Sequence, residues 1–214
     1  MKRLAGIARQ LVLWLGIAIG PMLPVAAPGL AAGGGSTPGA GRASAFVQPV
    51  LPADFCAVVP GAGAMQGELW RRTVPPPERG ATLRFLAVDC ASLHRLEAGH
   101  LARPAAMLTI LDLQPDPRLP PAPEAALEAL EKRFGAPELA AKAPVLGRDE
   151  RAVYLQQGDW SAQAAPGPRG VSAFAFRGAG PFVVNIFHFA KPPAVAAVRE
   201  QVEGVVRSVI EGSR

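Results

Sequence analysis

The sequence has few of the residues that most often carry catalysis or bind metals. Its 214 residues include only two cysteines, three histidines and one tyrosine. The cysteines, Cys56 and Cys90, lie far apart, whereas zinc sites usually use close pairs such as C-x2-C. No serine lies in a G-x-S-x-G elbow, and no acidic run follows the spacing of a calcium loop. The sequence therefore predicts no catalytic residue, no metal site and no cofactor.

Charged residues are absent from the span 10–41, which follows Lys2, Arg3 and Arg9. This span opens with an apolar run over 11–20 and continues into small residues, with the best cleavage site after Ala31. A basic start, an apolar run and small residues are the pattern of a signal peptide, which we predict over 1–31. An uncleaved N-terminal anchor is the alternative, but three prolines interrupt the roughly 20 apolar residues that a spanning helix needs.

The excess of positive charge comes mainly from this segment. The whole chain carries 22 basic and 17 acidic residues, a net charge of +5. Without the three basic residues of the signal, 19 remain against 17, a charge of about +2. Such a balance gives no basis for nucleic-acid binding. No later run reaches membrane length, so we expect no membrane span after the signal is removed.

An exported chain with only two cysteines is typical of a protein with one disulfide. We therefore predict a Cys56–Cys90 disulfide and a periplasmic or secreted location. If the N-terminus stays as an anchor, the same domain would face the periplasm from the inner membrane.

The composition changes once more before the folded part of the chain. Residues 32–45 are mostly glycine, alanine, proline and serine, with Arg42 as the one charge, which is typical of a flexible linker. The single domain is predicted over 46–214, a length that is sufficient to bury a core.

Within this domain we predict six strands and at least two clear helices. The predicted strands are Phe55–Val59, Thr82–Cys90, Ala105–Leu113, Arg151–Gln157, Val171–Arg177 and Phe182–Ala190. The clearest helices are Glu124–Phe134 and a valine-striped helix from Pro192-Pro193 to Ile210. Both faces of Phe182–Ala190 are apolar, which indicates that helices cover both. The predicted fold is α+β, a largely antiparallel sheet of five to six strands with helices on both faces and the C-terminal helix packed on it.

The late strands, the Lys191-Pro192-Pro193 break and the valine-rich helix to Ile210 are similar to the PsbP-type αβα sandwich of several exported bacterial and thylakoid-lumen proteins. The resemblance covers 46–214 in the order of elements, and its most specific part is Val171–Ile210. It implies a non-catalytic accessory or binding role. The Cys56/Cys90 pair is not part of that general pattern.

Three polar residues are the remaining candidates for a functional site. His94 lies four residues after Cys90, and Asn185 and His188 lie in the most apolar strand. With Cys56 and Cys90, the two histidines could form a zinc site or a thiol–histidine pair. A disulfide would remove the thiolate that either role needs, and a buried neutral histidine is the commoner use of such a position.

The sequence thus favours a non-catalytic binding or accessory domain of the cell envelope, whose partner is an envelope protein or a small ligand. The alternative is a Cys/His-dependent enzyme or a metal-binding envelope protein.

Overall fold

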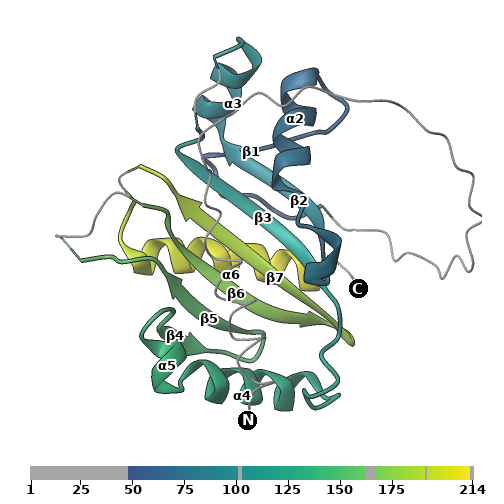
Figure 1. Ribbon diagram of the computed structural model, residues 1–214, viewed down its shortest axis with the longest axis vertical. Helices are drawn as coiled ribbons and strands as arrows, with labels where there is room; N and C mark the ends of the chain where they lie inside the picture. The colour runs from purple at the N-terminus through teal and green to yellow at the C-terminus, as the bar shows by residue number, and fades with distance from the viewer. Residues whose placement is uncertain (1–47, 101–102, 162–166, 191, 213–214) are drawn as a thin grey trace, which may run out of the picture. The chain divides into compact units, whose positions relative to one another are not determined.

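A computed structural model describes residues 48–100, 103–161, 167–190 and 192–212 (Figure 1). These residues form one antiparallel sheet of seven strands in the order β1-β2-β3-β7-β6-β5-β4, with five helices and one 3-10 turn. In chain order the elements are β1 (Phe55–Ala57), α2 (Ala64–Thr73), η1 (Pro77–Arg79), β2 (Ala81–Asp89), α3 (Cys90–Glu97), β3 (Ala106–Leu113), α4 (Pro123–Phe134), α5 (Pro137–Ala140), β4 (Val145–Arg148), β5 (Ala152–Gln157), β6 (Arg169–Arg177), β7 (Gly180–His188) and α6 (Val195–Glu211).

The antiparallel sheet and the C-terminal helix are confirmed, but the prediction of five to six strands is wrong. The seventh strand is β4, which was not predicted from the sequence. It has only four residues and lies at an edge of the sheet. Its third residue is Gly147, whose φ of 131° is accessible to glycine, and the pairing with β5 is irregular there. A strand this short with an internal glycine gives almost no alternating pattern.

Strand β7 is the centre of the sheet. It pairs with β3 on one side and with β6 on the other, and residues 182–187 are all buried. The turn that joins β6 to β7 has two central residues, Gly178 and Ala179. Only Gly178 has a positive φ, of 58°, which is the pattern of a type II′ hairpin turn.

Helix α6 covers one face of the sheet through its valines. It contacts β5, β6 and β7, and its buried residues are Val198, Val202, Val205, Val206 and Val209. The helix begins at Val195, not at Pro192-Pro193 as the sequence suggested. Ala194 before it is still extended, with φ −59° and ψ 146°. A proline keeps the residue before it out of the helical region, so Pro193 holds Pro192 extended and delays the first turn.

Helix α4 contacts the opposite face. The ring of its last residue, Phe134, lies 5.3 Å from the ring of Phe174 on β6. Phe174 pairs with Val153 on β5, and paired residues share a face. The next residue, Tyr154, therefore points to the other face. There its ring is covered by Arg199 of α6, at 5.0 Å.

Candidate functional site

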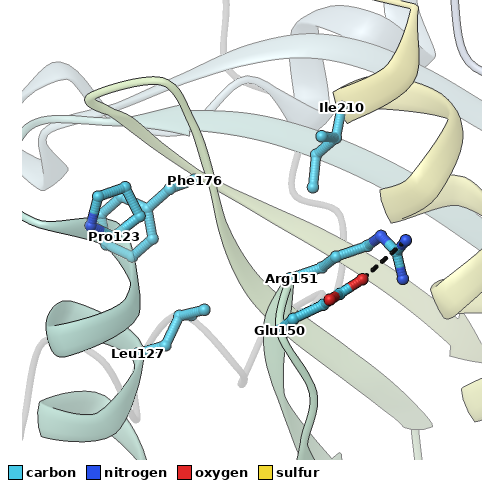
Figure 2. Close-up of a pocket in the computed structure, with 6 residues that line it drawn as sticks. All are labelled: Pro123, Leu127, Glu150, Arg151, Phe176 and Ile210. Carbon is cyan, nitrogen blue, oxygen red and sulfur yellow. Dashed lines mark ion pairs between the residues drawn. The ribbon is translucent and has the colours of Figure 1, made fainter.

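The described chain has a pocket at one end of the sheet, with a volume of about 300 Å³. It lies between the first turns of α4, the β4–β5 turn, the end of β6 and the last turn of α6, and we call it the α4–α6 pocket (Figure 2). Its lining residues come from all four of these elements: Pro123, Leu127, Glu150, Arg151, Phe176 and Ile210.

The apolar walls of the pocket follow from how each element begins or ends. Proline suits the first position of a helix, so α4 starts at Pro123 and places Leu127 one turn later, on its buried face. Phe176 is the penultimate residue of β6, and its side chain is only half-buried. Ile210 lies in the last turn of α6 and is also half-buried. Phe176 and Ile210 are thus incompletely covered where their elements end, and Leu127 is buried.

The polar side of the pocket is held by Asp149 in the β4–β5 turn. One carboxylate oxygen accepts the amides of Arg151 and Ala152, at 2.7 and 2.8 Å. The other accepts the hydroxyl of buried Tyr154 at 2.8 Å. Burial and the bond to Asp149 both raise the pKa of Tyr154, so its hydroxyl stays a donor at neutral pH. The backbone that carries Glu150 and Arg151 is therefore fixed before anything binds.

Glu150 and Arg151 form an ion pair at the pocket, with 2.9 Å between Oε1 and Nη2. The two side chains differ in their surroundings. Glu150 is 75% exposed, whereas Arg151 is 36% exposed. An exposed pair of this kind contributes only about 0–1 kcal/mol, because water screens it. Among the lining residues these two are the only ionisable ones. The arrangement is suited to binding.

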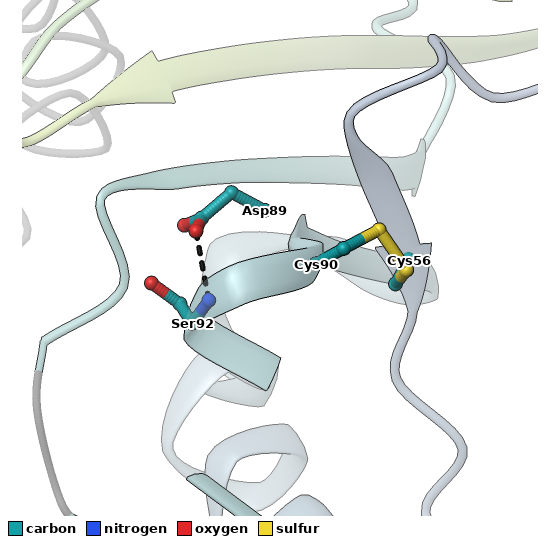
Figure 3. The surroundings of a disulfide bond; sticks show 4 residues. All are labelled: Cys56, Asp89, Cys90 and Ser92. Carbon is teal, nitrogen blue, oxygen red and sulfur yellow. Dashed lines mark hydrogen bonds between the residues drawn. A yellow bond between two sulfur atoms is a disulfide. The ribbon is translucent and has the colours of Figure 1, made fainter. Parts of the chain in front are cut away.

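The predicted disulfide is present (Figure 3). It lies on different elements from those that line the pocket. It joins Cys56 of the edge strand β1 to Cys90, the first residue of α3. The junction between β2 and α3 is fixed by Asp89, whose carboxylate accepts the amides of Ser92 and Ala106 at 2.8 and 2.9 Å. Burial alone would raise the pKa of Asp89, but these hydrogen bonds outweigh it and lower the pKa. Asp89 thus caps the start of α3, and the disulfide links that end of the helix to the edge strand β1.

Asn185 takes part in a buried chain of hydrogen bonds across three strands. Its side-chain oxygen accepts the hydroxyl of Ser172 at 2.6 Å, and its amide nitrogen donates to the hydroxyl of Thr109 at 3.1 Å. All three residues are at most 8% exposed. The amide is thus used within the sheet and is not directed into the pocket.

The two histidine candidates are not brought together with the cysteines into one site. His94 is exposed on α3, and His188 is half-buried at the end of β7. Burial lowers the pKa of His188, and nearby Asp89 opposes this only in part. Within the described ranges, no group of three His, Cys, Asp or Glu side chains is placed to hold a metal ion.

No pocket residue was predicted from the sequence as part of a site. The sequence predicts the helix over 124–134 and the strands that carry Arg151 and Phe176, but these segments are distant in the chain. A proline-rich run before α4 was the one local sign of an unusual surface there.

Comparisons with known proteins give no relative for this chain. No family model, curated protein or solved structure matches it. Among the described residues, no helix combines the length and the apolar character needed to cross a membrane.

Proposed function

We propose that the protein is an exported, non-catalytic binding or accessory domain of the cell envelope, and that the α4–α6 pocket is its recognition site. The observation that carries the proposal is the pocket itself. It combines the apolar side chains of Leu127, Phe176 and Ile210 with the Glu150–Arg151 ion pair. Asp149 holds the backbone of this pair by accepting the amide of Arg151. Concave sites that combine apolar side chains with a few placed polar groups are typical of ligand recognition.

The rival function, a Cys/His-dependent enzyme or metal protein, receives less support. Both cysteines are in the disulfide, so neither offers a thiolate as nucleophile or metal ligand. His188 and His94 lie in different settings, one at the end of β7 and one on the outer side of α3. The binding role needs no change of redox state and no rearrangement of these side chains.

Two further parts of the proposal rest on the sequence. Export is inferred from the signal-like residues 1–31, and the disulfide supports it, since such bonds persist in oxidising compartments. Kinship with the PsbP-type αβα sandwich is inferred from the order of elements. The meander of β4 to β7 and the closing helix α6 support that inference.

The proposal can be tested by NMR on the oxidised, ¹⁵N-labelled protein. A set of compounds with apolar parts of up to about ten non-hydrogen atoms would be titrated, because that size suits a pocket at the small end of the ligand range. Binding is expected to shift the amide signals of residues 150–151, 127 and 176. Ile210→Trp should fill the pocket and abolish these shifts.

Val74→Trp is the matched control, because Val74 is 47% exposed and lies outside the pocket. This variant should bind as the wild type does. The proposed site would be wrong if no compound moved those signals, or if Ile210→Trp bound ligands unchanged. A reproducible turnover that depends on His188 or on the cysteines would support the rival function instead.

A further inference from the structure

We propose that the α4–α6 pocket selects a small monocarboxylate, an acid with an apolar tail, and that Arg151 binds the carboxylate after exchanging partners with Glu150. This inference rests on the proposed function and adds to it the ligand class and the residue that determines selectivity.

The volume limits the size of the ligand. About 300 Å³ corresponds to roughly ten water volumes at ~30 Å³ each, so a molecule of about ten non-hydrogen atoms fills it. The walls limit its character, because Pro123, Leu127, Phe176 and Ile210 offer almost no hydrogen-bonding groups. In Figure 2, Pro123, Phe176 and Leu127 lie on one side of the pocket, and Ile210 lies on the other side, above the Glu150–Arg151 pair. A short apolar chain or one aromatic ring is the complementary shape.

The ion pair determines the charge of the ligand, because its two members are not equally exposed. Glu150 is 75% exposed and is well solvated whether paired or not, so releasing it from Arg151 costs little. Arg151 is only 36% exposed, so a ligand that covers it removes most of its remaining hydration, and its charge then requires an anionic partner. A ligand carboxylate can accept two parallel N–H bonds from the guanidinium, which is the strongest pairing open to it.

A cationic ligand would have to use Glu150 instead. That side chain keeps most of its surface in water, so the pairing would be screened and weak. It would also leave the guanidinium of Arg151 without its partner at the pocket. The asymmetry of the pair therefore favours an acid over a base.

The site is also ordered in advance. Asp149 holds the amide of Arg151, and Tyr154 in turn holds Asp149. Binding then needs to fix only the Arg151 side chain and the ligand, which keeps the entropic cost low. Substituting the side chain of Arg151 leaves these backbone bonds in place, so Arg151 can be tested without dismantling the turn.

The test uses hexanoate and its neutral analogue hexanamide as probes, titrated into the oxidised protein by NMR. In the wild type hexanoate should bind at least tenfold more tightly than hexanamide. Arg151→Gln should remove this preference and Arg151→Lys should keep part of it, because lysine retains the charge without the planar fork. Glu150→Gln should strengthen hexanoate binding two- to threefold, since no carboxylate then competes, and leave hexanamide unchanged.

The outcomes separate this inference from the proposed function. If hexanoate and hexanamide bind alike in the wild type and in Arg151→Gln, the pocket binds ligands but the acid selectivity is wrong. If neither probe binds and Ile210→Trp changes nothing for any compound, the pocket is not the recognition site at all. Should Arg151→Gln fail to fold, Glu150→Gln alone decides, because an unchanged or weaker affinity for hexanoate there would overturn the exchange of partners.

Discussion

At the scale of single residues, Asn185 illustrates how a polar group can be fully used inside an apolar sheet. Ser172 on β6 and Thr109 on β3 are its direct partners in register on the two neighbouring strands. The three side chains hydrogen-bond only if both registers are correct. A slip by one residue would move Asn185 to the other face and leave all three groups without partners. The chain of bonds therefore specifies the pairing of the three central strands.

This role predicts that substitutions of the three residues have non-additive effects on the free energy of unfolding. Asn185→Leu keeps a similar volume but leaves two buried hydroxyls unpaired, and should lower the free energy of unfolding by about 1–3 kcal/mol. The triple variant Thr109→Val, Ser172→Ala, Asn185→Leu removes all the partners together and should recover most of that loss. Urea unfolding of the two variants and the wild type measures the difference. If the free energy of unfolding of the triple variant were lower still than that of Asn185→Leu, the losses would simply add and the proposed network would be wrong.

His188 gives a prediction for pH. Burial disfavours its charged form and lowers its pKa, so the unfolded chain binds this proton at a higher pH than the folded one. Between the folded pKa and about 6.5 the unfolded state holds more protons, and stability therefore rises with pH. The contribution of His188 is complete above about pH 6.5 and is lost as the pH falls below it.

We expect His188→Asn to flatten the dependence of the urea midpoint on pH between 5 and 7. His94→Asn is the control, because His94 is exposed on α3 and should leave the slope as it is. Asp89 should not contribute to this slope, because its pKa is lowered and its effect on stability therefore falls below about pH 4. Equal slopes for the wild type and His188→Asn would show that His188 does not titrate in this way.

At the scale of elements, Arg199 protects the edge strand β4. Its guanidinium donates to the carbonyl of Leu146 at 2.8 Å, pairs with Glu203 at 2.7 Å and lies over the ring of Tyr154. Gly147 lies beside this guanidinium, and its φ of 131° is in the region that favours glycine. A carbonyl on an open edge is a point where another strand can pair, and here a helix side chain occupies it.

Arg199→Met should therefore have two effects. The free energy of unfolding should fall by about 1–2 kcal/mol for the lost hydrogen bond and cation–π contact. The uncovered edge should also promote self-association, which size-exclusion chromatography over a range of concentrations can detect. Arg207→Met is the matched control on the exposed side of the same helix. If both variants behaved alike, Arg199 would not be an edge-protecting residue.

The elements differ in how well the sequence predicts them. β7 was predicted because six consecutive buried residues make it apolar on both faces, and α6 because its valines recur at helical spacing. Strand β4 was not predicted, because its stability comes from pairing with β5 and from the hydrogen bond of Arg199 rather than from its own four residues. The start of α6 was placed too early, since local proline rules allow either position. Elements stabilised by their own pattern are predictable, and those stabilised by neighbours are not.

At the scale of the whole molecule, the same distinction separates the disulfide from the pocket. The disulfide follows from composition, since two cysteines have only one possible pairing within the chain and the predicted export favours it. The pocket joins residues 123, 151, 176 and 210, and no local pattern links them. It exists because four elements begin, turn or end at the same end of the sheet. Its residues could be found only once the topology was known.

The disulfide and the pocket also share no element, so they should respond separately to reduction. Closing a loop with a sequence separation of 34 should stabilise the fold by about 3–4 kcal/mol. We expect dithiothreitol to lower the urea stability of the wild type by that amount and Cys56→Ala/Cys90→Ala to match the reduced protein.

Hydrogen exchange should accelerate mainly in β1 and α3, because β1 has only three residues and pairs with β2 alone. Affinity for hexanoate should be the same in oxidised and reduced protein, as long as both are folded, since no pocket residue lies on β1, β2 or α3. The double variant is the control, because dithiothreitol should not affect it. A loss of ligand binding on reduction would show that the two ends of the sheet are coupled, and the pocket would then depend on the whole fold rather than on its four local elements.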